Sequence, residues 1–323
     1  MHFARTEEQD ELAAIVRSLL EKHSDSRAVR AVMESEAAYD ESLWGALCEQ
    51  VGVAALPIPE EYDGFGASLV ETAVVLEELG QNLAPTPLLA TAIASAALLV
   101  GGSDDLKAEL LPRIAGGEVA TLVAGPLVLD GASASIVLEA AGGDVTQGSP
   151  AIEGVGSLDQ TLGLGRVEGA DEVDGPLLDI AWALTSALQV GAAQRGLDMT
   201  VAYSKERVQF GRPIGSFQAL KHRMADMLVL VEASRSASWG ATAAAASYVQ
   251  DPTEDRARVL ARRAAVARSY CSDALDHVAS ETVQLHGGIA ITWEHDAHLV
   301  FKRAHALNRL WAPAHRARAR LID

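Results

Sequence analysis

The chain has 323 residues, enough for two or three domains with a substantial buried core, and 49% of the residues are apolar. The formal net charge of −18 argues against a nucleic-acid-binding protein, because phosphate contacts need a basic face. Residues 1–176 hold 8 Lys/Arg and 30 Asp/Glu, whereas residues 177–323 hold 18 and 14. Either the acids solvate the N-terminal surface, or the C-terminal half meets something anionic, such as a phosphate-bearing cofactor or a partner subunit.

Three features bear on the cellular location. The N-terminal stretch MHFARTEEQDELAAIV has no basic segment followed by an apolar one, so we expect no signal peptide. The apolar stretch at residues 92–100 is too short to span a bilayer. Cys48 and Cys271 lie far apart in helix-periodic segments and show neither a disulfide framework nor zinc spacing. We therefore expect reduced thiols, a cytoplasmic protein and no membrane association.

Residues 1–118 are predicted to form an N-terminal helical domain. Thr6 precedes an acidic helix start, and apolar residues then recur at a spacing of three to four. SLWGALCEQVGV and LVETAVVLEELGQ predict two further helices, the first ended by Pro57 and the second by Gly80. Residues 88–100 and 105–115 predict two more, closed by Gly116 and Gly117.

Residues 119–176 are predicted to form a small β domain. Helical periodicity disappears in this segment, and glycine and valine become frequent. TLVAGPLVL, ASIVLEA and AIEGV predict short strands separated by turns.

Residues 177–323 are predicted to form a C-terminal four-helix bundle. Periodic segments cover residues 178–207, 216–249, 251–285 and 296–322, and Asp251-Pro252 separates the second from the third. Long helices with short connections pack as an antiparallel bundle. The fold is therefore predicted to be mainly α, with helices, a reduced β domain and a bundle in that order.

Several motifs in this order resemble those of the acyl-CoA dehydrogenase family, and the resemblance covers most of the chain. They are PEEYDGFGAS, EELGQNLAPTPLL, LLPRIAGGE, ERVQFGRPIGSFQALKHRMADM and QLHGGIAITWEHDAHLVFKRA. The resemblance implies an FAD enzyme that desaturates an acyl-CoA between its α and β carbons. In that family a carboxylate takes the α proton, hydride passes to the flavin, and an electron-transferring flavoprotein receives the electrons. This chemistry needs a base, donors to the thioester carbonyl and a water-poor slot.

The resemblance also implies a set of residues that contact FAD across a dimer interface. Arg207 matches a pyrophosphate contact, which suits the planar fork of a guanidinium, and Phe210 matches a contact at the adenosine end. A solvated helix end also explains Arg207 taken alone, and a core position explains Phe217 equally well. The cofactor residues implied by the resemblance are Arg207, Phe210, Phe217, Gln218, Gln284, Gly287 and Gly288.

The sequence departs from the family in its β domain and in its base. The β domain is about half the usual length, and TLVAGPLVLDGASASIVLEA lacks the Thr-Glu-Pro-x-Ala-Gly-Ser-Asp stretch that grips the flavin ring. The two positions where family members place the catalytic Glu fall at Trp311 and near Ala181. Asp179 is a weak candidate for the base, with a helix cap or a solvated acid as the alternative. Glu294 lies in WEHDAH, where we expect helix-start and packing roles and no metal.

These features predict a shortened subunit of a heteromeric, FAD-dependent acyl-CoA dehydrogenase. It resembles the chains of actinobacterial α2β2 enzymes of steroid degradation, in which a partner chain supplies the missing half-site and bulky, ring-bearing acyl-CoA thioesters are accommodated. Two alternatives stay open. One is a self-sufficient homomeric dehydrogenase with Asp179 or Glu294 as a displaced base. The other is a non-catalytic assembly subunit.

Overall fold

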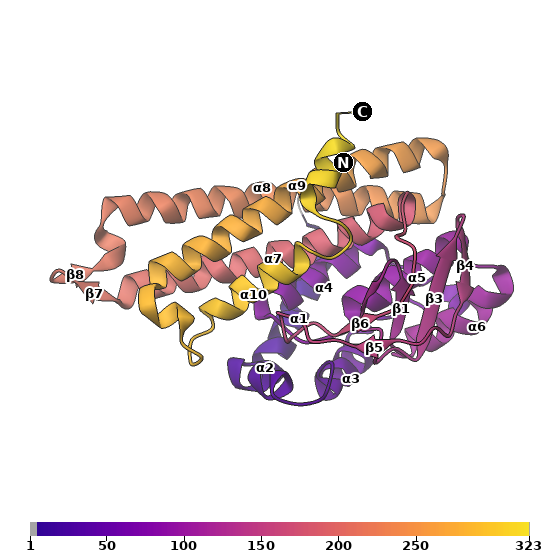
Figure 1. The fold of residues 1–323 in the computed structure, drawn as a ribbon, viewed down its shortest axis with the longest axis horizontal. Coiled ribbons are helices and arrows are strands. Elements are labelled where there is room, and N and C mark those ends of the chain that lie inside the picture. The colour runs from indigo at the N-terminus through magenta and orange to yellow at the C-terminus, as the bar shows by residue number, and fades with distance from the viewer. Residues whose placement is uncertain (1–4, 323) are drawn as a thin grey trace.

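The computed structural model describes residues 5–322, and it confirms a mainly α-helical fold of the predicted class (Figure 1). Capping boxes at Thr6 and Ser68 begin the first and fourth helices, as their sequences favour. The N-terminal helices are α1 (Glu7–His23), α2 (Ser26–Met33), α3 (Glu41–Gln50), α4 (Leu69–Asn82), α5 (Leu88–Gly101) and α6 (Asp104–Ala115), with a 3-10 turn η1 (Glu60–Tyr62). The helix predicted from SLWGALCEQVGV ends earlier than expected, at Gln50.

The β segment consists of two three-stranded sheets. The strands are β1 (Ala120–Val123), β2 (Leu127–Leu129), β3 (Ile136–Ala141), β4 (Asp144–Gln147), β5 (Glu153–Gly154) and β6 (Leu164–Arg166). One sheet has the order β1-β3-β4, with β1 parallel to β3, and the other has the order β2-β6-β5. The predicted strand TLVAGPLVL is in fact two strands in different sheets, because Gly125 (φ 139°) and Pro126 turn the chain between them.

Three long helices run side by side and form most of the C-terminal block (Figure 1). They are α7 (Pro176–Glu206), α8 (Gln218–Gln250) and α9 (Glu254–His286), followed by the 3-10 turn η3 (Gly287–Ile291). The fourth predicted helix is wrong in extent: it is split into α10 (Ala297–Leu307) and α11 (Ala314–Ala319). Trp311 and Ala312 have positive φ before Pro313, which no continuous helix permits.

One hydrophobic core joins the three parts of the chain, with members from α1, from β1 and β3, and from α7 to α11. Gly191 of α7 lies against the backbone carbonyl of Glu77 in α4 so closely that no Cβ would fit, which lets the two helices pack tightly. Cys48 and Cys271 are both free thiols, and burial raises the pKa of each to about 12. Within residues 5–322, no helix combines the length and apolarity needed to cross a membrane.

Candidate functional site

The connection between α7 and α8 is a short β-hairpin with an aromatic tip. β7 (Val208–Gln209) pairs with β8 (Arg212–Pro213), which leaves Phe210 and Gly211 as a two-residue turn with φ of 52° and 78°. Such turns need positive φ at both positions, and glycine meets this need without strain whereas phenylalanine does not. The Phe210 side chain is 92% exposed. A strained, fully exposed aromatic residue indicates a contact surface rather than a core position.

The residues next to this turn hold the hairpin in shape. The Ile214 N–H donates to the Arg207 carbonyl at 2.8 Å. The Phe210 and Phe217 rings meet edge to face with centroids 6.2 Å apart, and the Arg212 guanidinium lies 4.1 Å from the centroid of Phe217. Phe217 is half-buried against the hairpin itself. This position is compatible with both predicted roles, a cofactor contact and a core residue.

Arg207 caps the C-terminal end of α7 through its backbone, and its side chain is exposed. Among residues 5–322, no carboxylate forms an ion pair with its guanidinium. Gln218 is the first residue of α8 and is also exposed, with its amide 3.3 Å from the His222 ring. Both side chains are therefore available to an external group.

The glycine pair lies at the same end of the helical block. Gly287 ends α9 with φ 67°, and a Cβ placed on Gly287 or Gly288 would meet nothing within 4 Å. Gln284, one turn earlier, is exposed. Tyr203, in the last turns of α7, stacks on His286 with ring centroids 4.5 Å apart. This stack brings the two sequence motifs together, with all seven predicted cofactor residues on one open end of the molecule.

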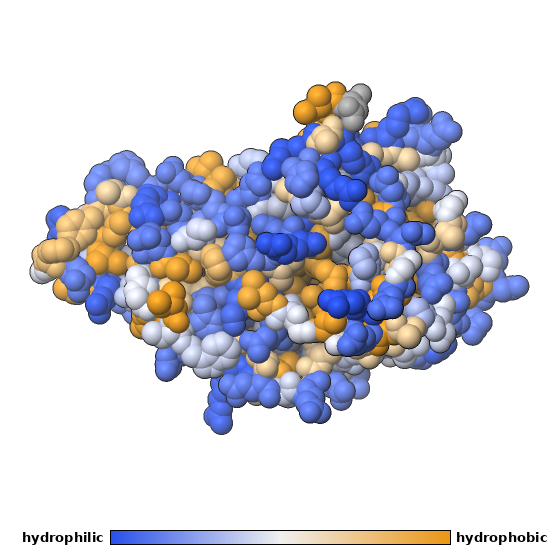
Figure 2. Space-filling view, viewed as in Figure 1, coloured by the Kyte–Doolittle hydropathy of each residue, from blue (hydrophilic) through white to orange (hydrophobic). Residues whose placement is uncertain are grey.

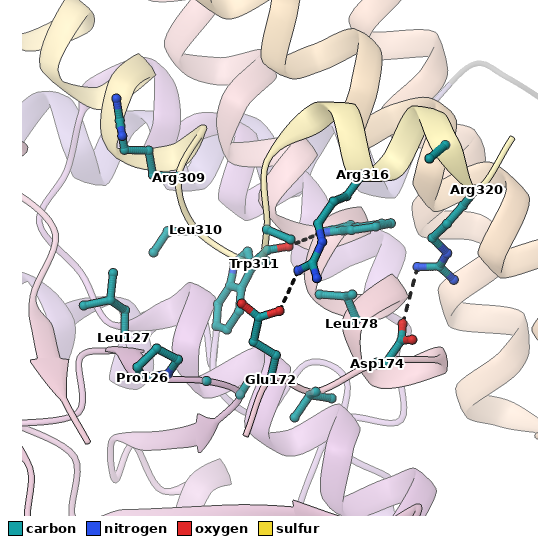
Figure 3. Close-up of a pocket in the computed structure, with 16 residues that line it drawn as sticks. Pro126, Leu127, Glu172, Asp174, Leu178, Arg309, Leu310, Trp311, Arg316 and Arg320 are labelled. Atoms are coloured by element: carbon teal, nitrogen blue, oxygen red, sulfur yellow. Dashed lines mark hydrogen bonds and ion pairs between the residues drawn. The ribbon is translucent and has the colours of Figure 1, made fainter. Parts of the chain in front are cut away.

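The other end of α7 faces a half-open cavity, which we call the Trp311 cavity. It has a volume of about 560 Å³ and is lined by residues from three segments of the chain, within 124–127, 172–182 and 309–320 (Figure 3). The first segment includes the turn between β1 and β2, the second the start of α7, and the third the connection from α10 to α11. The structure thus gathers the positions where the resemblance places the flavin-gripping strands and the base.

No carboxylate stands free at the two expected base positions. Ala181 is buried, and Trp311 is in the cavity wall with its carbonyl accepting the Trp182 indole N–H at 2.7 Å. Asp179 is not a helix cap, because Gly175 occupies that place, nor is it solvated, because it is 1% exposed. It forms an ion pair with Arg320 at 2.9 Å and is not in the cavity lining.

Burial raises the pKa of Asp179 to about 6, and Arg320 opposes this rise by stabilising the carboxylate. An acid with a pKa near neutrality has the thermodynamic profile of a general base. Asp179, however, lies behind the cavity wall and faces Arg320, so a substrate carbon in the cavity could not reach its carboxylate.

The Trp311 segment is held by an arginine that sequence analysis missed. Arg268 of α9 is fully buried, and its guanidinium donates to four backbone carbonyls. The acceptors are those of Leu307 (3.0 Å), Asn308 (3.1 Å), Leu310 (2.6 Å) and Ala312 (2.8 Å). Burial lowers the pKa of Arg268 to about 10, which leaves it charged at neutral pH. Arg268 lies four residues after Ala264 on the apolar stripe of α9, and this spacing could have indicated from the sequence that Arg268 is buried.

Glu294 is exposed in the turn before α10 and lies away from the Trp311 cavity lining. Its neighbour Asp296 accepts from Ser26 and Arg30, each at 2.7 Å, and so ties α10 to α2. The Trp293 ring lies 4.6 Å from the Lys302 ammonium. In the part of the chain that the structure describes, no three His, Cys, Asp or Glu residues are arranged to hold a metal ion.

The two sites are separated by the length of α7. Asp179 and Arg207 are 28 residues apart on one helix, and at about 1.5 Å rise per residue this places them roughly 40 Å apart. That distance exceeds the reach of one extended dinucleotide. A single copy of this chain therefore cannot bring both residues to one flavin.

Long helices in this order, with a small β segment between two helical blocks, define an acyl-CoA dehydrogenase-like protein. Family profiles agree: residues 6–118 match the acyl-CoA dehydrogenase N-terminal domain and residues 177–311 match the C-terminal domain. The chain is 48% identical over 314 residues to acyl-CoA dehydrogenase IpdE2 of Mycolicibacterium smegmatis, which covers 95% of this chain and 96% of that protein. The chain belongs to the acyl-CoA dehydrogenase family, whose members are oxidoreductases that act on CH–CH bonds.

Solved structures support the same placement. The steroid acyl-CoA dehydrogenase Tcur3481–Tcur3483 superposes with a TM-score of 0.84 at 26% identity, covering 98% of this chain and 97% of that one. The ChsE4–ChsE5 complex of Mycobacterium tuberculosis gives 0.83 at 26% identity, covering 99% and 98%. A more distant structure of the same fold is an acyl-CoA dehydrogenase of Bacillus anthracis complexed with FAD, at 16% identity and a TM-score of 0.79, covering 98% and 66%.

Proposed function

We propose that this chain is one subunit of a heteromeric, FAD-dependent acyl-CoA dehydrogenase and that its partner chain carries the catalytic glutamate. The observation that carries the proposal is the separation along α7. The cofactor-type residues are exposed at one end, whereas the base positions at the other end are Ala181 and a buried Trp311. A subunit built this way completes a flavin site on its neighbour and has no base of its own.

The open end of the molecule fits the pyrophosphate and adenosine part of FAD. Arg207 offers phosphate oxygens a guanidinium that pairs with no carboxylate of residues 5–322, and Phe210 offers an exposed ring to an adenine face. Gly287 and Gly288 leave their backbone open to close approach. When bound, FAD supplies the two-electron acceptor for desaturation. Phe217, Gln218 and Gln284 would border the same cofactor.

The relatives support a two-chain enzyme and a bulky substrate. Two similar structures carry paired chain names, Tcur3481–Tcur3483 and ChsE4–ChsE5, and the first is called a steroid acyl-CoA dehydrogenase. We infer an α2β2 assembly in the cytoplasm that acts on a steroid-derived or similarly bulky acyl-CoA, in cholesterol or other steroid catabolism. An electron-transferring flavoprotein would reoxidise the flavin.

One observation favours a second candidate, the self-sufficient homomeric dehydrogenase. The pKa of Asp179, about 6, suits a base, although its ion pair with Arg320 argues against that role. Glu294 gains no such support, because it is exposed and does not line the Trp311 cavity. A purely structural assembly subunit would have no need of an exposed, strained Phe210 beside a free Arg207.

The test is the visible flavin absorbance of this chain purified alone and after co-expression with a full-length dehydrogenase-like chain. We expect a colourless chain alone and a yellow, active mixed complex. In that complex, Arg207→Ala should weaken FAD retention roughly tenfold or more, because a charge-assisted contact contributes about 1.5–3 kcal/mol.

The matched control is Arg27→Ala, which removes an exposed arginine from α2 at a distance from the hairpin. Assembly should persist in both variants, as judged by size-exclusion chromatography. Full FAD occupancy in the Arg207→Ala complex, or a yellow and active chain alone, would overturn the proposal.

A further inference from the structure

We propose that His295 is a positioning residue for the cofactor-side glycine pair and that it acts only in its neutral form. It closes the base of the segment 287–294, which carries Gly287 and Gly288 and which we call the glycine loop. The consequence for FAD rests on the proposed function, in which the glycine pair contacts the cofactor. The closure of the loop itself can be measured without FAD.

Three rings meet at the base of the glycine loop. His286 directly precedes the loop and His295 directly follows it, and their ring centroids are 4.7 Å apart. Tyr203 of α7 stacks on His286 at 4.5 Å and meets the His295 ring edge-on at 6.3 Å. His286 is buried and His295 is half-buried. Side-chain contacts therefore hold the two ends of the loop together and tie them to α7.

A hydrogen bond fixes the protonation state of His295. The backbone N–H of Ala297, the first residue of α10, donates to His295 Nδ1 at 3.1 Å. A ring nitrogen accepts a hydrogen bond only when it carries no proton, so His295 is neutral in this geometry. Asp296 makes no capping hydrogen bond to α10 through its side chain within residues 5–322. His295 therefore satisfies a free N–H at the start of α10, as an Asn side chain does in an Asx turn.

The last residues of the glycine loop are anchored to α2 and α10. The Arg30 guanidinium donates to the Trp293 carbonyl, and also to the Asp296 carboxylate at 2.7 Å. The Trp293 ring stacks on His298 with centroids 5.1 Å apart. These anchors and the three rings together define the shape of the loop.

Protonation of His295 would place a positive charge in unfavourable surroundings. The neighbouring carboxylate of Asp296 is already paired with Arg30 at 2.7 Å and lies 3.6 Å from Arg195. A cation at the N-terminal end of α10 also opposes the helix dipole. The titratable and charged groups around His295 are Arg30 of α2, Arg195 and Tyr203 of α7, His286 of α9, and Glu294 and Asp296 on either side of it. Protonation therefore removes the Ala297 hydrogen bond and adds a cation close to arginines.

The pKa of His295 agrees with this geometry. Burial is the largest influence and lowers the pKa below the ordinary 6.5, whereas Asp296 raises it and Arg30 lowers it. Burial also lowers the pKa of His286. Because the folded pKa lies below the unfolded value, the closed loop is fully stable above about pH 6.5 and loses stability as pH falls through the folded pKa. Acid should therefore open the glycine loop and weaken FAD retention.

The first test is hydrogen–deuterium exchange of the glycine loop in the purified full-length chain at about pH 7.5 and pH 5.5. Variants are compared with the wild type at the same pH. His295→Asn keeps an acceptor for the Ala297 N–H but does not titrate, whereas His295→Ala removes the acceptor. We expect the wild type and His295→Asn to exchange alike at the higher pH and His295→Ala to exchange several-fold faster. At the lower pH the wild type should exchange several-fold faster than His295→Asn.

The second test is FAD affinity in the mixed complex over the same pH range. Relative to His295→Asn, the wild type should lose affinity several-fold on acidification, up to about tenfold if the pKa differs by about one unit between the closed and the open loop. His277→Asn changes an exposed histidine on α9 and is the control, which should follow the wild type in both tests. Circular dichroism checks that each variant is folded, and His295→Asn keeps the tests decisive if His295→Ala is not.

Equal exchange of the wild type and His295→Ala at the higher pH would overturn the proposal, as would the same acid sensitivity in His295→Asn as in the wild type. A loop that opens in acid without any change in FAD affinity would show that His295 closes the loop but does not position the cofactor, which also contradicts the proposal. A mixed complex that never holds FAD would instead contradict the proposed function. The exchange measured on the chain alone would still decide whether neutral His295 closes the loop.

Discussion

At the residue scale, burial changes the protonation of Asp130, an acid that the formal net charge counts as ionised. It is 3% exposed, lies in a left-handed conformation with φ 52°, and burial raises its pKa to about 8. Gly163 and Arg303 only partly offset this rise. Near neutral pH, the folded protein therefore holds a proton on Asp130 that the unfolded chain releases.

We expect this group to make the protein less stable as pH rises. Because the folded pKa lies above the unfolded value of 3.8, the stabilising protonated form is fully present below about pH 4 and is lost as pH rises through about 8. Asp130→Asn should raise the free energy of unfolding at pH 8 by about 1–3 kcal/mol, and it tolerates the same backbone conformation.

Urea unfolding between pH 5 and 9 measures this effect. The exposed Asp144→Asn on β4 serves as the matched control and should leave the profile unchanged. An Asp130→Asn protein with the wild-type pH dependence would show that the carboxyl is already ionised in the fold.

At the element scale, the connection between α10 and α11 is held by two buried side chains, Arg268 and Trp182. Arg268 supplies the only side-chain donors that reach the Leu307, Leu310 and Ala312 carbonyls within residues 5–322. Trp311 and Ala312 have φ of 57° and 75°, a conformation that non-glycine residues rarely adopt. The guanidinium holds this strained segment in place and so shapes the wall of the Trp311 cavity.

Arg268→Met should destabilise the protein by about 3 kcal/mol or more, because it leaves several buried carbonyls without donors. Arg268→Lys should rescue little, since an ammonium cannot reproduce the planar fork. Chemical denaturation followed by tryptophan fluorescence measures both variants. Arg262→Met, an exposed arginine on the same helix, is the control, and an equal effect at the two positions would contradict the assigned role.

The hairpin between α7 and α8 illustrates a different kind of element. Its sequence, RVQFGRPIGSF, carries no strong propensity for a two-residue turn, since Phe210 disfavours positive φ. The pairing of Val208 with Pro213 and the packing of Arg212 on Phe217 nevertheless hold it. The strained backbone and exposed ring of Phe210 indicate that the hairpin contacts another molecule.

At the scale of the whole molecule, one continuous core crosses the boundaries of the three predicted domains, 1–118, 119–176 and 177–323. Arg303 of α10 and Asp159 of the β segment form a buried ion pair across one of these boundaries. The three-domain division itself stays a prediction. The shared core makes independent unfolding of the parts unfavourable.

We therefore expect a single cooperative thermal transition for the purified chain. Differential scanning calorimetry should give calorimetric and van't Hoff enthalpies that agree. Two resolved transitions would show that the shared core is too weak to couple the segments.

The uneven distribution of charge between residues 1–176 and residues 177–323 is also a property of the whole molecule. Most of the negative charge belongs to residues 1–176, whereas the mildly basic half carries both the hairpin and the arginines of α11. Figure 2 shows hydrophilic side chains over most of the visible face, with apolar patches scattered across it, one of them at the hairpin end. A basic block with an exposed apolar tip suits a phosphate-bearing cofactor and a partner subunit together.

The sequence by itself determined the fold class, the order of its parts and the family. Helical periodicity over long segments is a local property, and the QFGRPIGSFQ and QLHGG motifs keep their spacing whatever the packing. The positions of most helices could be predicted from the sequence for the same reason. The strand boundaries did not, because short strands depend on partners far away in the chain.

Only the tertiary structure decided what surrounds each candidate. It placed Tyr203 on His286 and so joined two distant motifs, and it buried Asp179 against Arg320, where the sequence had suggested a weak base candidate, a helix cap or a solvated acid. The break in the fourth helix is held by Arg268, which is distant in sequence from the carbonyls that it contacts. The Trp311 cavity arises where three separate segments meet, and no local pattern encodes such a meeting.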